Sequence, residues 1–359
     1  MLLVHLFACA LPDDTAAPEA TYYAPDAPGP WSAGTAESTM TGPAGEYAVQ
    51  VWFPSSEAGG DPYAYDDFLL GSALENAAPD CGEARPVMVF SHGNAGLRYQ
   101  SIFLTEHLAT HGWVVVAPDH VGNTFFDDGD ASLADLILRR PLDVSATFDW
   151  LADTDADGLL AGCVDPDDGY AAAGHSFGGY TTLAVAGATL DAAASAAWCA
   201  DAAGDWLCGA FAEGMAAAGA TTLDRGDPRV WAAVPMAPAA YEVLVGGLAN
   251  VAVPTLVLGG TLDTITPMAT QVGPIYADLV ATPRALGVLE GAGHFSFSDA
   301  CAMVPTYDDC SPPYLPDAET HPVIATVTTA FLHATRGDAQ AEAWLPDPGA
   351  TFLTLEEAR

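Results

Sequence analysis

Residues 170–185 read YAAAGHSFGGYTTLAV, in which a short run of small apolar residues meets the pattern G-x-S-x-G and then a segment with helical spacing. The first run is typical of a buried strand, and the pattern is typical of a tight turn from a strand into a helix. Gly174 and Gly178 supply the small residues that this turn needs on either side. We expect Ser176 to be held in a strained conformation at the helix N-terminus. An ordinary glycine-rich junction is the alternative.

The alternation of strand and helix continues on both sides of this turn. Short apolar runs predict buried strands, and apolar residues three and four apart predict helices. The predicted strands are residues 47–53, 86–91, 113–117, 170–174, 230–236, 253–259 and 285–289, and the predicted helices are 99–111, 141–152, a segment from about 177, and 322–335. We therefore expect an α/β fold with a mainly parallel central sheet and helices on both faces.

One segment departs from this alternation. Residues 189–228 are rich in alanine and contain two cysteines, and they directly follow the helix after Ser176. They predict a helical insertion. Two interpretations stay open, because the insertion can act as a lid over a site near Ser176 or simply extend the scaffold.

A serine hydroxyl is a weak nucleophile, so it needs a base, and the base needs a carboxylate to hold its tautomer. Asp263 follows the strand at 253–259, and His294 follows the last predicted strand in a glycine-rich loop. Both therefore lie where the carboxyl ends of parallel strands meet, in the chain order Ser, Asp, His. We assign Ser176, Asp263 and His294 as candidate catalytic residues. For Asp263 alone, an acid that caps a helix is the alternative.

Other histidines are weaker candidates for the base. His175 is fixed beside Ser176 in the turn, where packing is its expected role. His321 lies in a turn bounded by proline and His333 in the last predicted helix, so we expect both to be structural.

Ester and amide hydrolysis by a serine also requires two donors for the negative oxygen of the intermediate. The backbone N–H of Phe177 follows the serine directly and is one candidate. The second is the N–H of Asn94, because Gly93 lets the backbone of the loop after strand 86–91 approach closely. We expect His92 to brace this loop.

The charge of the chain limits its partners. The sequence has 47 acidic and nine basic residues, a formal net charge of −38. Such a field repels phosphate, so nucleic acid and anionic membranes are excluded as partners. A solvated acidic surface is the simplest interpretation.

The two ends of the chain are expected to lie outside the folded domain. Residues 1–9 are apolar but too short to span a membrane, which favours an export signal. Leu6-Phe7-Ala8-Cys9 is also similar to a lipoprotein cleavage box, so Cys9 is a candidate lipid anchor. We expect a flexible tether over 10–45, the folded domain over 46–345, a tail over 346–359, and no transmembrane span.

Six further cysteines predict disulfides in an exported chain. We predict the pairs Cys81–Cys163, Cys199–Cys208 and Cys301–Cys310, because the last two are close in sequence and each would staple a loop near the predicted site. None of the cysteines has C-x-x-C spacing, so we do not expect zinc.

Residues 153–160, DTDADGLL, match the first eight positions of an EF-hand calcium loop. The candidate ligands are Asp153, Asp155, Asp157, the carbonyl of Leu159, and Asp165. The twelfth position is Val164 instead of glutamate, so a solvated acidic turn is the alternative. Any calcium here would be structural.

The motifs together resemble a known family. These motifs are Ser91-His92-Gly93, Gly174-His175-Ser176-Phe177-Gly178-Gly179, Thr261-Leu262-Asp263 and Gly293-His294-Phe295. They resemble the platelet-activating-factor acetylhydrolase and dienelactone-hydrolase-like branch of the α/β-hydrolases, over about residues 85–335, and more loosely the bacterial cutinase-like polyester hydrolases. The resemblance implies an α/β-hydrolase fold and the roles assigned above. The nucleophile is serine instead of the cysteine of dienelactone hydrolases, which favours plain ester hydrolysis.

We therefore expect a serine hydrolase that cleaves carboxylic esters, acts as a monomer and needs no cofactor. The alternatives are a polyester hydrolase, a peptidase or amidase, and a catalytically silent surface binding protein. The sequence does not reveal the acyl group or the alcohol of the substrate.

Overall fold

The computed structural model describes residues 24–66, 68–129, 131–155, 158–201, 206–345 and 351–358. The predicted export signal, Cys9 and the first part of the predicted tether, residues 10–23, lie outside the described residues. None of the described helices is long and apolar enough to cross a membrane.

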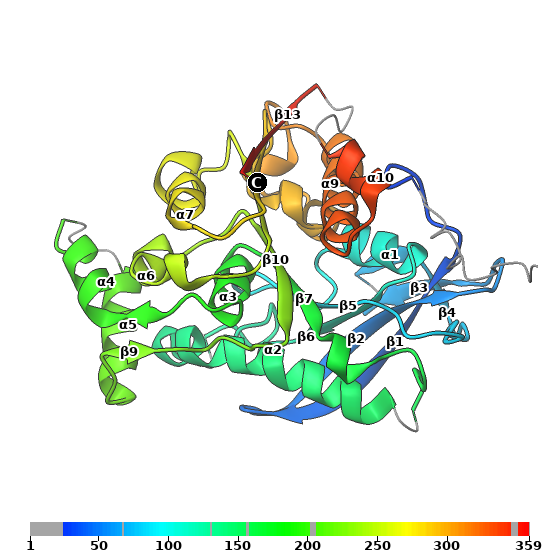
Figure 1. The fold of residues 1–359 in the computed structure, drawn as a ribbon, viewed down its shortest axis with the longest axis horizontal. Coiled ribbons are helices and arrows are strands. Elements are labelled where there is room, and N and C mark those ends of the chain that lie inside the picture. Colours follow the sequence, from blue (N-terminus) through cyan, green and yellow to red (C-terminus); the bar gives the residue numbers. More distant parts are fainter. Residues whose placement is uncertain are drawn as a thin grey trace, which may run out of the picture.

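A twisted central sheet forms the core of the described chain (Figure 1). Its strands lie in the order β13-β12-β11-β10-β7-β5-β6-β2-β1-β4-β3. They are β1 (Ser32–Gly42), β2 (Gly45–Ser55), β3 (Pro62–Tyr65), β4 (Leu69–Glu75), β5 (Val87–Ser91), β6 (Val114–Pro118), β7 (Tyr170–His175), β10 (Val230–Met236), β11 (Thr255–Gly260), β12 (Arg284–Leu289) and β13 (Leu353–Ala358). From β6 to β12 all neighbours are parallel, whereas β2 and β13 join antiparallel. This confirms the predicted α/β fold.

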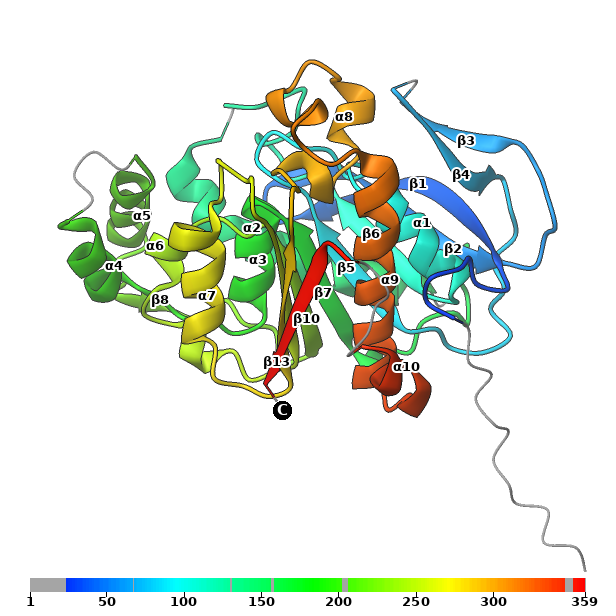
Figure 2. The ribbon, with the colours of Figure 1, turned by 90° about the horizontal axis from the view of Figure 1, so that it is seen from above.

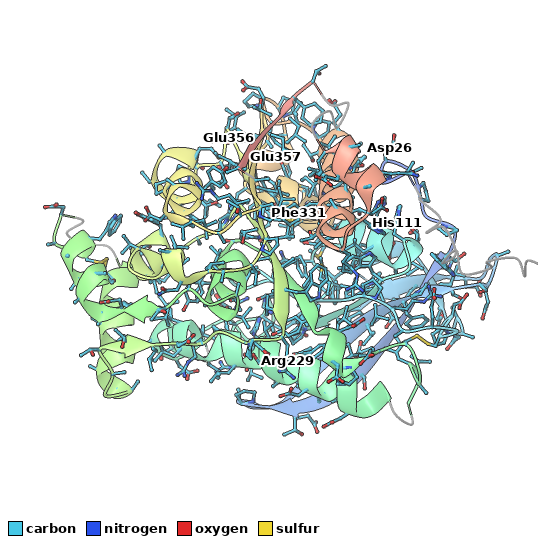
Figure 3. The ribbon with its side chains drawn as sticks, in the orientation of Figure 1. Asp26, His111, Arg229, Phe331, Glu356 and Glu357 are labelled. Atoms are coloured by element: carbon cyan, nitrogen blue, oxygen red, sulfur yellow. A yellow bond between two sulfur atoms is a disulfide. The ribbon has the colours of Figure 1, made fainter. Side chains whose placement is uncertain are left out.

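Helices cover both faces of the sheet (Figure 2). One face carries α1 (Ile102–Thr110), α9 (Asp317–Thr335) and α10 (Ala339–Trp344), and the other carries α2 (Leu133–Asp155), α3 (Phe177–Val185) and α7 (Gly273–Asp278). Phe331 of α9 packs into the apolar layer beneath that helix (Figure 3). The parallel strands are apolar along their whole length because both faces are buried.

Shorter elements lie in the connections. They are α4 (Ala192–Cys199), α5 (Trp206–Ala217), α6 (Tyr241–Leu244), α8 (Ala300–Met303), the small sheet of β8 (Leu190–Asp191) and β9 (Thr222–Leu223), the 3₁₀ turns η1 (Pro166–Asp168), η2 (Leu248–Asn250), η4 (Phe295–Phe297) and η5 (Asp308–Cys310), and the π-helical turn η3 (Met268–Val272). The predicted helical insertion corresponds to β8, α4, α5 and β9. Its helix α5 packs against α2, and α4 packs against α5 and α6.

Two strands of the sheet lie outside the bounds that the sequence predicted for the folded domain. Residues 32–42 were expected in the tether but form β1, which pairs with β2 from Ser32 to Gly42. Residues 353–358 were expected in a tail but form β13, an edge strand that carries Glu356 and Glu357 (Figure 3). Both strands have weak apolar patterns, and backbone pairing with a neighbouring strand stabilises them. The charges on β13 protect that edge from pairing with another chain.

Helix α2 also begins earlier than expected. The sequence predicted a start at Pro141, where proline is common, but the helix already begins at Leu133 and carries Pro141 in its interior. Burial of Leu136 and Ile137 against the sheet stabilises the added turns.

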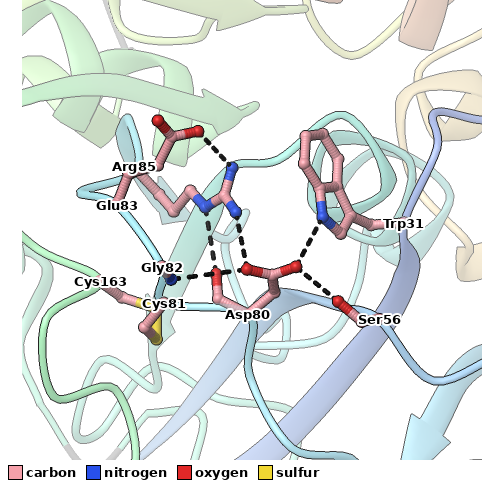
Figure 4. The surroundings of a disulfide bond; sticks show 8 residues. All are labelled: Trp31, Ser56, Asp80, Cys81, Gly82, Glu83, Arg85 and Cys163. Atoms are coloured by element: carbon pink, nitrogen blue, oxygen red, sulfur yellow. Dashed lines mark hydrogen bonds and ion pairs between the residues drawn. A yellow bond between two sulfur atoms is a disulfide. The ribbon is translucent and has the colours of Figure 1, made fainter.

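The described cysteines form the three predicted pairs, Cys81–Cys163, Cys199–Cys208 and Cys301–Cys310. The first joins the segment after β4 to the segment before β7. Figure 4 shows its surroundings, in which Asp80 accepts hydrogen bonds from Arg85 and Trp31, each at 3.1 Å. This polar cluster ties the antiparallel strands to the parallel part of the sheet.

We expect loss of the Cys81–Cys163 disulfide to destabilise the fold more than loss of Cys199–Cys208. The two cysteines are 82 and nine residues apart, respectively. Chain entropy then predicts losses of roughly 4.5 and about 3 kcal/mol in the free energy of unfolding. Denaturant unfolding of the two double Cys→Ser variants would measure this order, and equal losses would contradict it.

Candidate active site

Ser176 occupies the turn between β7 and α3, with φ 58° and ψ −117°. A positive φ is strained for a residue with a side chain, so the expected strain is present. The turn is too tight for larger neighbours. A Cβ on Gly174 would lie 2.5 Å from the carbonyl oxygen of Gly178, and a Cβ on Gly178 would lie within van der Waals overlap of the Ser91 carbonyl. The glycines of the motif therefore let the turn pack against the end of β5.

Three of the predicted residues meet at this turn. His294 Nε2 lies 2.9 Å from Ser176 Oγ, and His294 Nδ1 lies 2.8 Å from Asp263 Oδ2. The carboxylate accepts from Nδ1–H, which leaves Nε2 free to accept the serine proton. All three residues are buried to at least 90%, so these hydrogen bonds are shielded from water. The arrangement can deprotonate a serine hydroxyl and store the proton on the imidazole.

Asp263 is held by more than the histidine. Its Oδ1 accepts from the backbone N–H groups of Ile265 at 2.8 Å and Thr266 at 2.7 Å, and its Oδ2 accepts from the Thr266 hydroxyl at 2.7 Å. Burial alone would raise the pKa of Asp263, but the hydrogen bond and charge of His294 and the bonds from Thr266 lower it to about 2. The sequence analysis missed Thr266. It lies in the run Thr264-Ile265-Thr266, where nothing in the local pattern separates it from any other loop threonine.

A second chain of hydrogen bonds runs behind the serine. Gln100 Oε1 accepts from the backbone N–H of Gly93 at 2.9 Å, and its Nε2 donates to His175 Nδ1 at 3.0 Å. His175 Nε2 then donates to the backbone carbonyl of His294 at 3.0 Å. Burial lowers the pKa of His175 to about 3, so the ring is neutral and can serve both partners. His175 thus links the loop of Gly93 to the loop of His294.

Gln100 is the second residue that sequence reasoning missed. It lies at the start of the segment that was predicted as a helix, where a glutamine has no distinctive pattern. His321 and His333, the weaker candidates for the base, lie elsewhere: His321 stacks on Phe103 and His333 contacts Trp113.

The loop after β5 lies against the serine. A Cβ on Gly93 would lie 3.4 Å from Ser176 Cβ, so the backbone of this loop borders the nucleophile directly. The backbone N–H groups of Asn94 and Phe177 have no hydrogen-bond acceptor among the described residues. Two unpaired donors beside a serine hydroxyl can bind an oxyanion.

A cavity of about 360 Å³ opens above Ser176 and His294. Much of its wall is aromatic or apolar. The larger lining side chains are Phe68, Leu97, Phe125, Phe295, Met303, Val304 and Tyr307. Phe295 and Tyr307 stack with their ring centroids 4.4 Å apart on one side, next to the Cys301–Cys310 disulfide. Among the described lining residues none comes from 189–228, so the segments around α8 and after β6 form the rim.

The predicted calcium loop is not supported. Helix α2 continues to Asp155, so Asp153 belongs to a helix and not to an open loop. Asp165 caps η1, and Leu159 lies in a turn with an exposed side chain. Asp157 and the side chain of Asp155 lie outside the described residues. Within the part of the chain that is described, no group of three or more His, Cys, Asp or Glu side chains is placed to hold a metal ion.

The low pKa of Asp263 predicts a specific dependence of stability on pH. A carboxyl with pKa about 2 in the folded protein and the ordinary 3.8 when unfolded stabilises the fold above pH 3.8 and loses this effect as the pH falls to 2. The difference in unfolding free energy between wild type and Asp263→Asn should therefore shrink by about 2 kcal/mol between pH 6 and pH 2. Urea unfolding at several pH values measures this difference in unfolding free energy. Asp201→Asn is the control, because it removes a carboxylate that is exposed to solvent. A constant difference would contradict the prediction.

Comparison with known proteins identifies related sequences. The model of the PET hydrolase-like family matches residues 207–308, and the chlorophyllase model matches residues 71–201. The first match contains Asp263 and His294, and the second contains Asn94 and Ser176. Each covers less than half of the chain.

Among curated proteins, the chain is similar to cutinases. Cutinase 2 of Thermobifida cellulosilytica is 27% identical over 210 residues, 58% of this chain and 60% of the relative. Cutinase cut1 of Thermobifida fusca and cutinase est1 of Thermobifida alba are also 27% identical over 58% of this chain, and over 49% and 53% of their own lengths. The chain thus spans about half to three fifths of the curated relatives that it matches.

These matches confirm the looser resemblance to cutinase-like proteins that the motifs indicated. The chain is a member of the α/β-hydrolase superfamily.

Proposed function

We propose that the chain is a serine hydrolase that cleaves carboxylic esters through an acyl-enzyme. The observation that carries this proposal is the continuous chain of hydrogen bonds from Ser176 through His294 to Asp263, at 2.9 and 2.8 Å. The similarity to cutinases and to the PET hydrolase-like family supports the same class of reaction.

The reaction proceeds in two acyl transfers. Ser176 Oγ attacks the ester carbonyl while His294 Nε2 takes its proton, and the imidazolium then gives this proton to the departing alcohol. A water molecule next gives a proton to His294 and attacks the acyl-enzyme carbonyl. The bond between the carbonyl carbon and Ser176 Oγ then breaks, the imidazolium returns its proton to Oγ, and the carboxylic acid leaves. Asp263 holds the imidazole tautomer throughout. Every group in this scheme belongs to the chain, so we propose no cofactor.

The negative oxygen formed in each step needs donors that are already in place. We propose the backbone N–H groups of Asn94 and Phe177 for this role. Their position on either side of Ser176, and the lack of a competing acceptor among the described residues, support it. Such donors typically contribute about 3 kcal/mol each to transition-state stabilisation.

A polyester is the substrate that a second observation favours. Phe68, Phe125 and Phe126 form a cluster of rings at the cavity mouth, with exposed fractions of 48%, 49% and 61%. Exposed aromatic rings beside an open cavity suit an extended apolar ester. The resemblance to the acetylhydrolase branch would favour a short acyl group instead.

We also propose that the protein is exported and monomeric. Three disulfides support an oxidising compartment. The strongly acidic composition argues against nucleic acid as a partner.

Ser176→Ala is expected to abolish hydrolysis of p-nitrophenyl esters without unfolding the protein. Asp263→Asn and His294→Ala should each lower kcat by about three orders of magnitude or more, because the three side chains act as a unit. A fluorophosphonate probe should label wild type and not Ser176→Ala. Circular dichroism and thermal unfolding of the variants serve as the folding control.

Other outcomes would favour the alternatives. Labelling of Ser176 together with cleavage of anilides faster than esters would favour an amidase or peptidase. Absence of both labelling and hydrolysis in wild type would favour a silent binding protein and end the proposal.

The aromatic cluster predicts a dependence on substrate size. Phe125→Ala should reduce release of acid from a polyester film and hydrolysis of long-chain p-nitrophenyl esters several-fold, while the acetate ester is barely affected, because only extended substrates reach the rim. Trp206→Ala is a matched control, since Trp206 is an exposed aromatic residue at 70% that does not line the cavity. Equal losses for acetate and for long chains would contradict the assignment.

A further inference from the structure

Arg140 of α2 is a buried cation in contact with the active-site loops. Its residue exposure is 0%, and it is the only arginine among the described residues that is fully excluded from solvent. Burial of a charge costs several kcal/mol unless hydrogen bonds and opposite charge compensate it. An apolar side chain would cover the sheet at lower cost. Arg140 therefore calls for an explanation beyond packing.

The guanidinium binds the loop that carries Asn94. Its Nη2 donates to the backbone carbonyl of His92 and lies 3.2 Å from Ser91 Oγ. Its Nη1 donates to Asn123 Oδ1 at 2.7 Å. Asn123 is itself buried, and its Nδ2 donates to Asn94 Oδ1 at 2.9 Å. Arg140 thus holds the loop just before Gly93 directly and Asn94 through one intermediate side chain.

The same guanidinium also contacts the turn of the nucleophile. Its central carbon lies 4.6 Å from the centroid of the Phe177 ring, a distance typical of a cation–π contact. Phe177 is buried at 5% exposure, so this contact is shielded from water. One cation therefore touches both segments whose N–H groups we assign to the oxyanion.

The surroundings of Arg140 hold it in place. Asp143, fully buried one turn along α2, contacts His120 Nδ1 at 2.9 Å and Arg139 Nη1 at 3.3 Å. His120 Nε2 lies 2.9 Å from Ser91 Oγ, and the backbone N–H of His120 donates to His92 Nε2 at 3.0 Å. Arg139, the neighbouring arginine, also contacts Asp143 but binds none of the loop groups that Arg140 binds.

We propose that Arg140 is a positioning residue that sets the distance between the two oxyanion donors, Asn94 N–H and Phe177 N–H. This inference rests on the proposed function. Fixed donors need no reorganisation when charge develops on the substrate oxygen, which is where much of the rate enhancement of such sites arises. The positive charge of Arg140 beneath a water-poor site further favours the negative intermediate. Its effect is expected on the transition state and not on substrate binding.

Arg140→Met removes the charge and all three hydrogen bonds at similar length. We expect kcat for p-nitrophenyl butyrate to fall about 100-fold, as for loss of an oxyanion donor, while KM stays within about twofold. Arg140→Lys should recover part of kcat, because an ammonium keeps the charge but cannot reproduce the fork of donors. The rate of fluorophosphonate labelling should fall in parallel with kcat, since the phosphonyl oxygen uses the same donors.

Arg139→Met is the matched control, because it removes a neighbouring buried arginine from the same helix. It should lower the unfolding temperature and leave kcat per folded molecule within about threefold of wild type, as expected for a group outside the site. If Arg140→Met does not fold, Asn123→Ala decides the question. That variant breaks the connection between Arg140 and Asn94 and a hydrogen bond to Asp128, but it keeps Arg140 and its contacts with His92 and Phe177. It should lower kcat by about 10-fold or more with KM unchanged, as misplacement of a catalytic group does.

The outcomes separate this inference from the proposed function. Unchanged kcat in folded Arg140→Met, or in Asn123→Ala where Arg140→Met fails to fold, overturns the positioning role, and so does an equal loss of kcat in Arg139→Met. In those cases labelling of Ser176 in wild type would leave the esterase proposal intact. A wild type that is neither labelled nor active would instead refute the esterase proposal itself.

Discussion

The approach of Gly178 to the carbonyl of Ser91 is the contact on which the site depends. Because no side chain fits between them, the turn after β7 lies directly against the end of β5. This places Ser176 beside the loop of Gly93 and Asn94, and it forces the serine into a positive φ. The buried strands on both sides hold this strained conformation, since β5 and β7 are buried along their whole length and β10 at all but one residue. A larger residue at Gly178 would separate Ser176 from the backbone N–H groups that we propose as oxyanion donors.

Around that contact, buried polar side chains connect loops that are distant in sequence. Gln100 and His175 join the loop of Gly93 to the loop of His294, and Arg140 joins it to Phe177. Burial of such polar groups costs free energy unless they form hydrogen bonds. Each of these side chains is hydrogen-bonded to a loop whose position apolar packing alone would not define. The apolar layers on both faces of the sheet stabilise the fold, while these polar connections determine where the reactive atoms lie. The residues that stabilise the fold are therefore different from those that set the geometry of the site.

The regions that sequence analysis predicted well share one property, a strong local pattern. The parallel strands are continuous apolar runs. The glycines around Ser176 are required by the tight turn itself, so they can be interpreted without knowing the rest of the fold. The regions that it missed lack such a pattern. β1 consists mostly of small and polar residues and exists because β2 pairs with it, and β13 lies at an edge that only β12 stabilises. The first turns of α2, residues 133–140, likewise form because they pack against the sheet, and their local sequence does not show that this surface is present.

The sequence by itself determined the fold class, the turn at Ser176, the two close cysteine pairs and the candidate trio with Asp263 and His294, because these features follow from local spacing and from the ends of parallel strands. The pair Cys81–Cys163, 82 residues apart, comprises the two cysteines that those close pairs leave over. Only the tertiary structure decided which side chains support that trio. Thr266, Gln100 and Arg140 have no distinctive local pattern, and each also has a partner that is distant in the sequence. Thr266 Oγ1 lies 3.2 Å from His294 Nδ1, Gln100 donates to His175, and Arg140 donates to the carbonyl of His92, over separations of 28, 75 and 48 residues. A hydrogen bond over such a separation depends on how helices and loops pack, and no periodicity in the chain encodes it.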